Sequence, residues 1–339
     1  MHRALCATLI LVGASLLQAV SPIKHPGAAF IHLQVLDPLG GKSTDATIFY
    51  PTPMSVEGPT QLGPYRIEAA PGQPCAKGLF PLVTISHGHA GSRFGHHNLA
   101  TFLARQGFIV ASLDHPGDNH RDLTGFGTDA VLLGRPLQVS ALIDATLAHP
   151  LIGSHVDATR IGAMGFSAGG YTTLLLAGAW PKFELVKGYC QRHPEDQEIC
   201  SLGDIRRTHP EITHVADPRV KAIFAMAPLG VFFDKVALRS VRVPVFLYAA
   251  EKDQVLLVDE NASHVRDCLP RPPEYRMVPG AGHYVFLAPT PALQATLPAL
   301  FQDPPGVDRA AIQTRIEQDA LAFFSNALAA PLTTQEGKH

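Results

Sequence analysis

The chain has 339 residues, of which 46% are hydrophobic and 17% are charged, and its formal net charge is −2. This length suffices for one large α/β domain with a sizeable core, or for two small domains. The near-neutral charge and the lack of a basic run argue against binding to nucleic acid or to a lipid headgroup surface.

The first residues have the pattern of an export signal. A short basic segment, residues 1–3, precedes the apolar residues 4–17, and small residues around Ala19 suit cleavage. Because a membrane-spanning helix needs about 20 apolar residues, we expect a signal peptide at residues 1–21; an uncleaved anchor is the alternative. The mature chain, residues 22–339, would then be periplasmic or secreted, with no stable membrane insertion.

Four cysteines remain after the predicted leader. An even number in an oxidising compartment allows disulfides, and free buried thiols are the alternative. Cys190 and Cys200 are close in sequence and flank a polar segment, so they are the favoured pair. A bond between Cys75 and Cys268 follows only by elimination. No C-x-x-C pair occurs, so we expect no structural zinc site.

The predicted elements begin with two strands, at residues 31–36 and 46–50, and continue with a Pro- and Gly-rich irregular stretch at residues 51–78. Strands and helices then alternate. Apolar runs predict strands at 79–86, 108–113, 161–165, 220–227, 243–249 and 275–278. Helical spacing predicts helices at 98–106, 137–148, 169–179, 258–268 and 310–329. This alternation predicts an α/β fold with a mainly parallel sheet covered by helices on both faces.

A polar segment at residues 181–219 interrupts this alternation. It contains several prolines and both members of the favoured disulfide. Insertions of this length in compact domains are usually functional or disordered. Its position after the helix at 169–179 predicts a cap over a cleft, and a surface loop without function is the alternative. We expect residues 117–135 to form the other wall of that cleft.

The sequence Gly165-Phe166-Ser167-Ala168-Gly169 is a G-x-S-x-G pentapeptide between a predicted strand and a predicted helix. A nucleophile elbow needs this context, because a sharp turn there lifts a serine hydroxyl into a cleft. Side chains at the two glycine positions would collide with neighbouring backbone. The pentapeptide alone can arise by chance, but its flanking elements make Ser167 the candidate nucleophile.

A serine nucleophile needs a base, normally a histidine oriented by a carboxylate. In this fold the order along the chain is serine, acid, histidine. His283 follows the last predicted strand in a glycine-rich loop, whereas the other downstream histidines do not lie at strand ends. Asp253 follows the preceding strand and is the candidate acid, with Glu251 in the same loop as its competitor. The strand before that ends at residues 225–228, which contain no carboxylate.

The developing negative charge in such a reaction needs two backbone N–H donors. We predict the N–H groups of Ala168, at the start of the helix, and of His89, in the loop after the strand at 79–86. Several histidines lie at two neighbouring strand ends: His87, His89, His96, His97, His115 and His120. They could bind a metal, or they could line a cleft and cap helices. The H-x-H pattern is a poor metal signal, so we expect no metal and no cofactor.

Three stretches of the chain resemble α/β-hydrolases, and more narrowly the secreted bacterial proteins called predicted dienelactone hydrolases and the platelet-activating factor acetylhydrolases. These stretches are residues 86–92 (SHGHAGS), 107–115 (GFIVASLDH) and 165–170 (GFSAGG). Dienelactone hydrolases have a cysteine at the elbow, so Ser167 does not support thiolate chemistry on lactones. The acetylhydrolases place their acid after the strand that ends here at Ala227. That position has no carboxylate, so their phospholipid substrate does not carry over.

The resemblance and the motifs together predict an exported serine hydrolase that cleaves a small-molecule carboxylic ester. Ser167 would attack the ester carbonyl with His283 as base, and Asp253 would orient His283. The N–H groups of His89 and Ala168 would hold the oxyanion, and water would hydrolyse the acyl-enzyme. An amidase or peptidase with the same triad is one alternative. A catalytically inactive hydrolase fold used for binding is the other.

Overall fold

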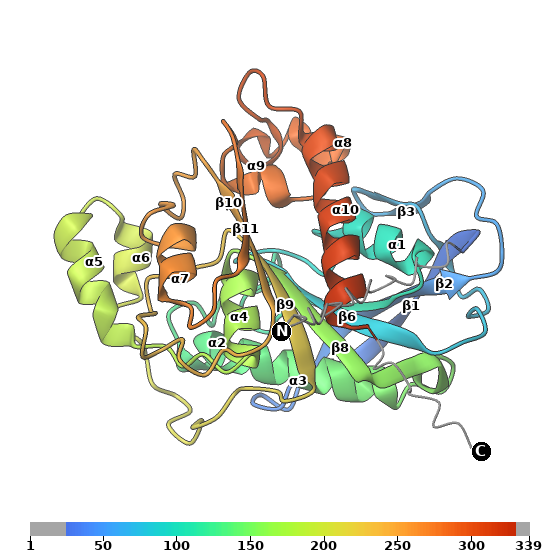
Figure 1. Ribbon diagram of the computed structural model, residues 1–339, viewed down its shortest axis with the longest axis horizontal. Coiled ribbons are helices and arrows are strands. Elements are labelled where there is room, and N and C mark those ends of the chain that lie inside the picture. The colour runs from blue at the N-terminus through green and yellow to red at the C-terminus, as the bar shows by residue number, and fades with distance from the viewer. Residues whose placement is uncertain (1–24, 330–339) are drawn as a thin grey trace, which may run out of the picture.

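The computed structural model describes residues 25–329 (Figure 1). Its centre is a nine-stranded sheet with the order β11-β10-β9-β8-β6-β7-β2-β1-β5. The strands are β1 (Gly27–Leu36), β2 (Ser43–Thr52), β5 (Ala70–Pro71), β6 (Phe80–Ser86), β7 (Ile109–Leu113), β8 (Val156–Phe166), β9 (Val220–Met226), β10 (Val245–Ala250) and β11 (Glu274–Val278). Strand β2 runs antiparallel to β1 and β7, whereas the strands β6 to β11 pair with one another in parallel. The predicted α/β class and mainly parallel sheet are confirmed.

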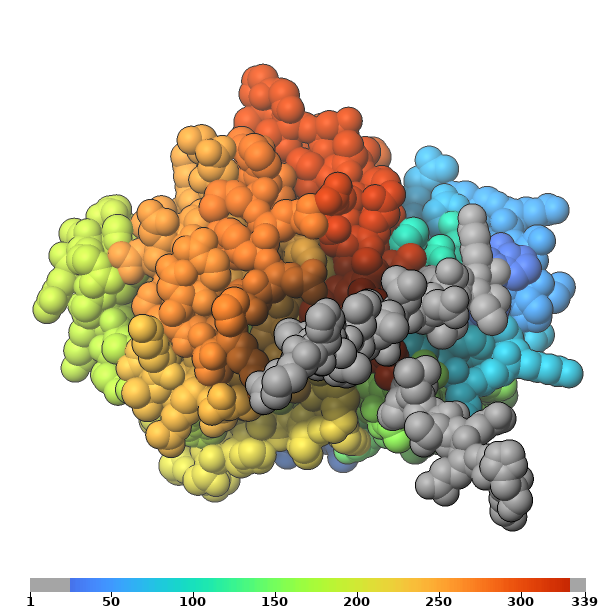
Figure 2. Space-filling model, viewed as in Figure 1, coloured from blue at the N-terminus to red at the C-terminus, as the bar shows by residue number. Residues whose placement is uncertain are grey.

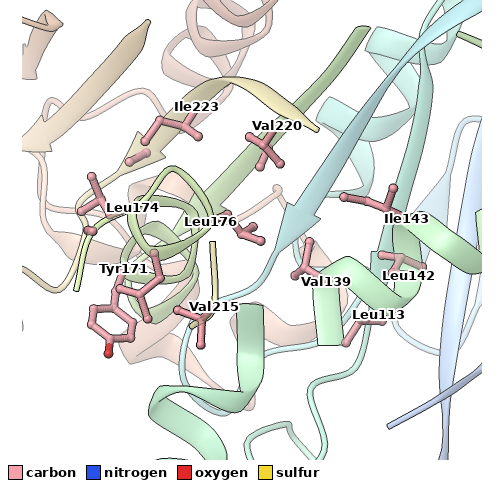
Figure 3. Packing of buried hydrophobic residues seen from close by; sticks show 14 of the residues in the cluster. Leu113, Val139, Leu142, Ile143, Tyr171, Leu174, Leu176, Val215, Val220 and Ile223 are labelled. Carbon is pink, nitrogen blue, oxygen red and sulfur yellow. The ribbon is translucent and has the colours of Figure 1, made fainter. Parts of the chain in front are cut away.

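Helices cover both faces of the sheet (Figure 1). Helices α1 (His97–Arg105) and α10 (Arg309–Ala327) pack on one face, and α3 (Gly134–Leu147), α4 (Ala168–Leu176) and α7 (Ala262–Cys268) pack on the other. Successive strand residues point to opposite faces, so each buried strand supplies two cores. Val110 thus joins the core under α1, whereas Ile109 and Leu113 join the core under α3. Figure 3 shows some of the side chains of this second core.

The differences from the predicted elements are short segments. The stretch at residues 51–78, predicted as irregular, contains β5 and a small hairpin of β3 (Thr60–Leu62) and β4 (Tyr65–Ile67). The helices α2 (Asp129–Leu132), α8 (Pro291–Gln294) and α9 (Pro298–Phe301) were not predicted. Strands of three residues and helices of four are too short to produce a recognisable hydrophobic period.

The insertion, residues 181–219, forms the 3-10 turn η2 (Phe183–Leu185) and the helices α5 (Val186–Arg192) and α6 (Gln197–Ser201). Figure 2 shows its yellow-green atoms at the left end of the molecule, beside the orange atoms of the region around residue 260. Arg192 forms an ion pair with Glu260 across this contact, at 2.6 Å.

The favoured disulfide, Cys190–Cys200, is present in the structure and joins α5 to α6. The second expected pair is wrong, because Cys75 and Cys268 are both free. Cys75 follows β5 at one edge of the sheet, whereas Cys268 ends α7, which packs on β10 near the other edge. The expectation of this pair came from elimination among four cysteines, which says nothing about the distance between two residues at opposite edges of the sheet. Burial raises the pKa of the Cys75 thiol to about 11, so it stays protonated.

The predicted signal peptide, residues 1–21, lies outside the described residues. Within residues 25–329, no helix combines the length and the apolar character needed to cross a membrane.

Candidate active site

Ser167 lies in a sharp turn between β8 and α4, with φ +56° and ψ −119°. This left-handed backbone is strained for a serine and persists only where its surroundings hold it. The N–H of Ser167 donates to the Met226 carbonyl at 2.9 Å, and its carbonyl accepts from the Leu229 N–H at 3.2 Å. A Cβ on Gly165 would lie 2.1 Å from the Gly169 carbonyl oxygen, so the turn closes only with glycine there.

Asp253 and His283 come together at the ends of neighbouring strands. Asp253 follows β10, and His283 follows β11 at the start of the 3-10 helix η3 (His283–Phe286). His283 Nδ1 donates to Asp253 Oδ2 at 2.6 Å, and both side chains are 2% exposed. The other carboxylate oxygen of Asp253 accepts from the N–H groups of Val255 and Leu256. Such an arrangement holds the ring in one orientation.

Glu251, the competing acid, instead accepts a hydrogen bond from the Gly280 N–H at 2.8 Å. It therefore shapes the loop that leads to His283 and does not contact the imidazole ring. Asp234, between β9 and β10, forms an ion pair with Lys182 at 2.7 Å.

Ser167 and His283 line one cavity of about 520 Å3. Both segments predicted as walls contribute to it. The range 117–135 supplies Asp118, Phe126, Gly127, Val131, Leu132 and Arg135, and the insertion supplies Glu195, Asp196, Gln197, Glu198, Ile199 and Leu202. The loop at 254–257 also lines the cavity and was not predicted to do so. The role of the insertion as a cap over a bound substrate stays a prediction.

The two predicted oxyanion donors, Ala168 and His89, both line this cavity. Ala168 is the first residue of α4, so its N–H is one of those that a helix leaves without an internal partner. Neither N–H has a hydrogen-bond partner among the described residues. The loop after β6 comes very close to the elbow, because a Cβ on Gly88 would lie 3.3 Å from the Cβ of Ser167.

The direction of the His89 N–H depends on the carbonyl of Gly88, because the two belong to one planar peptide group. No described peptide bond is cis, so this N–H and carbonyl point in opposite directions. Two donors hold the Gly88 carbonyl, His87 Nδ1 at 2.7 Å and the Gly91 N–H at 3.1 Å. Because these two hydrogen bonds hold the Gly88 carbonyl oxygen in place, they also fix the direction of the His89 N–H on the opposite side of the peptide group.

His87 can act as this donor only in one tautomer. The His115 N–H donates to His87 Nε2 at 3.0 Å, so Nε2 must be unprotonated and Nδ1 must carry the hydrogen. Burial, assisted by the nearby charge of Arg135, lowers the pKa of His87 to about 4. His87 is therefore neutral at ordinary pH, as both hydrogen bonds require.

Arg135 is 1% exposed and binds three parts of the chain at once. It forms an ion pair with Asp118 at 2.6 Å and donates to the His87 carbonyl and to the hydroxyl of Thr172 on α4. Burial acts to raise the pKa of Asp118, but the Arg135 charge and the His89 hydrogen bond hold it at about 2. Sequence reasoning missed this pair, because no motif marks a buried arginine and its partner 17 residues away.

The other clustered histidines also make local hydrogen bonds. His115 contacts the Ser86 hydroxyl and the Gln138 side chain, each at 2.8 Å, and His89 Nδ1 lies 2.5 Å from Asp118. His96 and His97 contact the carbonyls of Phe286 and Phe94. Residues 25–329 contain no group of three or more metal-ligating side chains placed to hold an ion. These histidines hold together the loops around the cavity.

Comparisons with known proteins found two similar curated sequences and, separately, similar solved structures. No family model matches the sequence. Acylamino-acid-releasing enzyme of Rattus norvegicus is 27% identical over 170 residues, which cover 48% of this chain and 22% of that protein. The same enzyme of Homo sapiens is 30% identical over 139 residues, or 39% of this chain and 18% of that protein. The chain thus matches about a fifth of the length of these relatives.

Among solved structures, a ferulic acid esterase from Streptomyces cinnamoneus superimposes with a TM-score of 0.62 at 21% identity. The match covers 95% of this chain and 96% of that one. The strand order is that of a mixed sheet in which only the first strands are antiparallel. Because likeness over nearly the whole length agrees with this topology and with the resemblance of the motifs, the chain is an α/β-hydrolase by fold.

Proposed function

We propose that this protein is a serine hydrolase that cleaves carboxylic esters. The observation that carries the proposal is the convergence of three strand ends on one cavity. Ser167 in its strained turn and His283 both line that cavity, and His283 is hydrogen-bonded to the buried Asp253. Three residue types in the order serine, acid, histidine, placed in this way, suit nucleophilic acyl transfer.

In the proposed reaction, His283 Nε2 takes the proton of the Ser167 hydroxyl as the oxygen attacks the ester carbonyl. Asp253 stabilises the imidazolium ion that results. The oxyanion of the tetrahedral intermediate binds to the N–H groups of Ala168 and His89, which need no reorganisation because their directions are already set. His283 then protonates the leaving alcohol. Water, deprotonated by the same histidine, hydrolyses the acyl-enzyme by the reverse sequence.

The second candidate is cleavage of an amide or peptide by the same residues. The matches to acylamino-acid-releasing enzymes favour this candidate, and the match to a ferulic acid esterase favours the first. Model nitrophenyl esters and matching nitroanilides, compared on one preparation, separate the two. Esters should have the higher kcat/KM, and a preference for the anilides would replace the first candidate by the second.

A fluorophosphonate probe tests the mechanism directly. The probe should form an adduct on Ser167, located by mass spectrometry of the digested protein. The His283→Ala variant is the matched control and should label far more slowly, because the serine loses its base. An unlabelled Ser167 in folded protein would instead favour an inactive hydrolase fold used for binding.

We also propose that residues 1–21 direct export, so that the protein works in the periplasm or outside the cell. The disulfide Cys190–Cys200 supports an oxidising location. Expression of the full chain, followed by N-terminal sequencing of the exported product, tests the proposal. Intact, uncleaved protein confined to the cytoplasm would contradict it.

A further inference from the structure

A second cavity, of about 530 Å3, lies beside the one that contains Ser167 and His283. Neither of those two residues lines it, so the proposed reaction does not yet account for it. The two cavities meet at five residues that line both: His89, Phe126, Phe166, Glu198 and Tyr284. Four of these five are exposed or half-buried, so the boundary is accessible and is not closed by packing. A molecule bound in one cavity can therefore extend into the other.

The second cavity comes close to the nucleophile on the side of the loop after β6. Residues 87–92 of that loop line it. A Cβ on Gly88 would lie 3.1 Å from the Phe166 ring and 3.3 Å from the Cβ of Ser167. His89, one of the two proposed oxyanion donors, lines both cavities. An ester carbonyl held between Ser167 and the His89 N–H thus lies where the cavities meet, and its two substituents can enter different cavities.

Beyond this boundary, leucines from three separate segments line the second cavity and not the first. Leu123 lies between β7 and α2, Leu287 follows η3, and Leu300 is on α9. Their surfaces are accessible, because Leu123 is 48% exposed and the other two are half-buried. Of the described residues that line this cavity, Glu198 is the one acid, and none is a lysine or arginine. An apolar group bound there would remove leucine surface from water, which favours binding.

We propose that the second cavity is a subsite for one half of the ester, while the other half occupies the cavity that contains Ser167. The inference rests on the proposed function, because it concerns the substrate of the same catalytic residues. It narrows the substrate class to esters with a bulky apolar group, of the size of a phenyl ring, on each side of the ester bond. A cavity of about 530 Å3 has room for such a group.

Four esters test the proposal, with acid release followed at constant pH. Methyl acetate has no ring, methyl phenylacetate has one in the acyl half, benzyl acetate has one in the alcohol half, and benzyl phenylacetate has both. Each ring should raise kcat/KM by about tenfold or more, the scale of burying an aromatic side chain. In benzyl phenylacetate the two gains should multiply, because the rings occupy separate cavities. If this ester were cleaved no faster than the better ester with one ring, the proposal would be overturned.

Narrowing the second cavity identifies the half that it binds. Leu300→Trp and Leu123→Trp each introduce a larger side chain from a different segment, and the Tm shows that each variant is folded. Either variant should abolish the gain from one ring, in the acyl or in the alcohol half, and keep the gain from the other. The matched control, Leu297→Trp, is at a 45% exposed position outside both cavities and should keep both gains. Both gains unchanged in the two folded variants would contradict the subsite.

A binding measurement separates this proposal from the proposed function. In the background of Ser167→Ala, calorimetry compares N-benzyl-2-phenylacetamide with N-methyl-2-phenylacetamide and with N-benzylacetamide. The amide with two rings should bind about tenfold more tightly than either amide with one, and adding Leu300→Trp should abolish its advantage over one of them. This result would support the subsite even if no ester were hydrolysed. Equal binding of all three amides would overturn it even if Ser167 reacted with fluorophosphonate.

Discussion

Two ion pairs beside the cavity belong to regions of opposite character. Arg135 and Asp118, 1% and 3% exposed, lie beneath the loop that holds His89. Arg192 and Glu260, 56% and 25% exposed, attach the insertion to the region around residue 260. We call the first region, residues 86–91 and 114–118 with the starts of α3 and α4, the base of the site. Apart from His89, its polar side chains are buried and bonded to one another, whereas those of the insertion mostly face solvent.

This difference separates two tasks. The base holds the backbone groups that would contact the reacting carbonyl, and small errors in their position are costly for catalysis. The insertion forms a wall around the rest of the substrate, where side chains can vary without moving those groups. A rigid base and a loosely attached wall would let specificity change while the chemistry stays the same.

The largest expected effect on catalysis comes from a substitution at the base of the site. Ser167→Ala should lower kcat for a nitrophenyl ester by about 10⁴-fold or more, because the nucleophile is lost. The Tm should change little, since the hydroxyl makes no hydrogen bond that the fold depends on. Ser201→Ala, on the exposed side of the insertion, is the control and should retain wild-type kcat. Turnover by Ser167→Ala at the wild-type rate would end the assignment.

The buried ion pair should come next. Arg135→Met leaves the Asp118 carboxylate and the His87 carbonyl without their partner, which should cost about 3–5 kcal/mol in the free energy of unfolding. The kcat should fall as well, because the loop that holds His89 loses its support. The double variant Arg135→Met/Asp118→Leu should recover part of the stability in urea titrations. If Arg135→Met lowered the free energy of unfolding by less than about 1 kcal/mol, the buried ion pair would contribute no more than the exposed pair of Arg192 and Glu260.

Lowering the pH should lower the free energy of unfolding through the buried histidines at the base of the site. Burial lowers the pKa of His87 to about 4 and that of His96 to about 3. Below about pH 6.5 the unfolded chain binds a proton at each histidine and the folded chain does not, so the free energy of unfolding falls as the pH drops. Each histidine contributes a slope of about 1.4 kcal/mol per pH unit down to its folded pKa.

His89, whose pKa is raised by its hydrogen bond to Asp118, acts in the opposite direction. Its contribution is present below about pH 6.5 and is lost as the pH rises through the folded pKa. Urea titrations between pH 5 and 8 measure the sum. A flat profile below pH 6.5 would contradict the buried, neutral state of His87 and His96.

The exposed ion pair should give the smallest effect. Arg192→Ala should reduce the free energy of unfolding by less than about 1 kcal/mol, because solvent screens the pair and ordering two long side chains costs entropy. The KM can change through the insertion, but kcat should stay within about twofold, since no group of the base is touched. A loss of stability as large as that of Arg135→Met would show that the insertion is part of the rigid core.

The long elements of the fold could be predicted because buried parallel strands have nearly continuous apolar runs. The order of serine, acid and histidine then singled out Ser167, Asp253 and His283, each after a predicted strand, and the structure brings the latter two into contact. Their catalytic roles stay predictions until the variants are tested. Short elements could not be predicted, because three or four residues define no period.

The supporting residues could not be predicted for a different reason. Arginine is rarely buried, so the sequence marks Arg135 only as the last residue of the segment expected to form a wall of the cleft. Its importance arises only where the loops after β6 and β7 meet, which no local pattern records. The predicted pairing of Cys75 with Cys268 was wrong because the number of cysteines gives no information on the distances between them.

The second glycine of the pentapeptide, Gly169, lies where the backbones that carry the two proposed oxyanion donors meet. A Cβ on Gly169 would lie 1.9 Å from the carbonyl oxygen of Ser86, so α4 and the end of β6 touch with no side chain between them. The separation of the Ala168 and His89 N–H groups is then set by the contact of two main chains. Under the proposed function, substitutions in the cavity wall would change the choice of substrate and leave this separation intact, whereas a single methyl group at residue 169 would force the two donors apart.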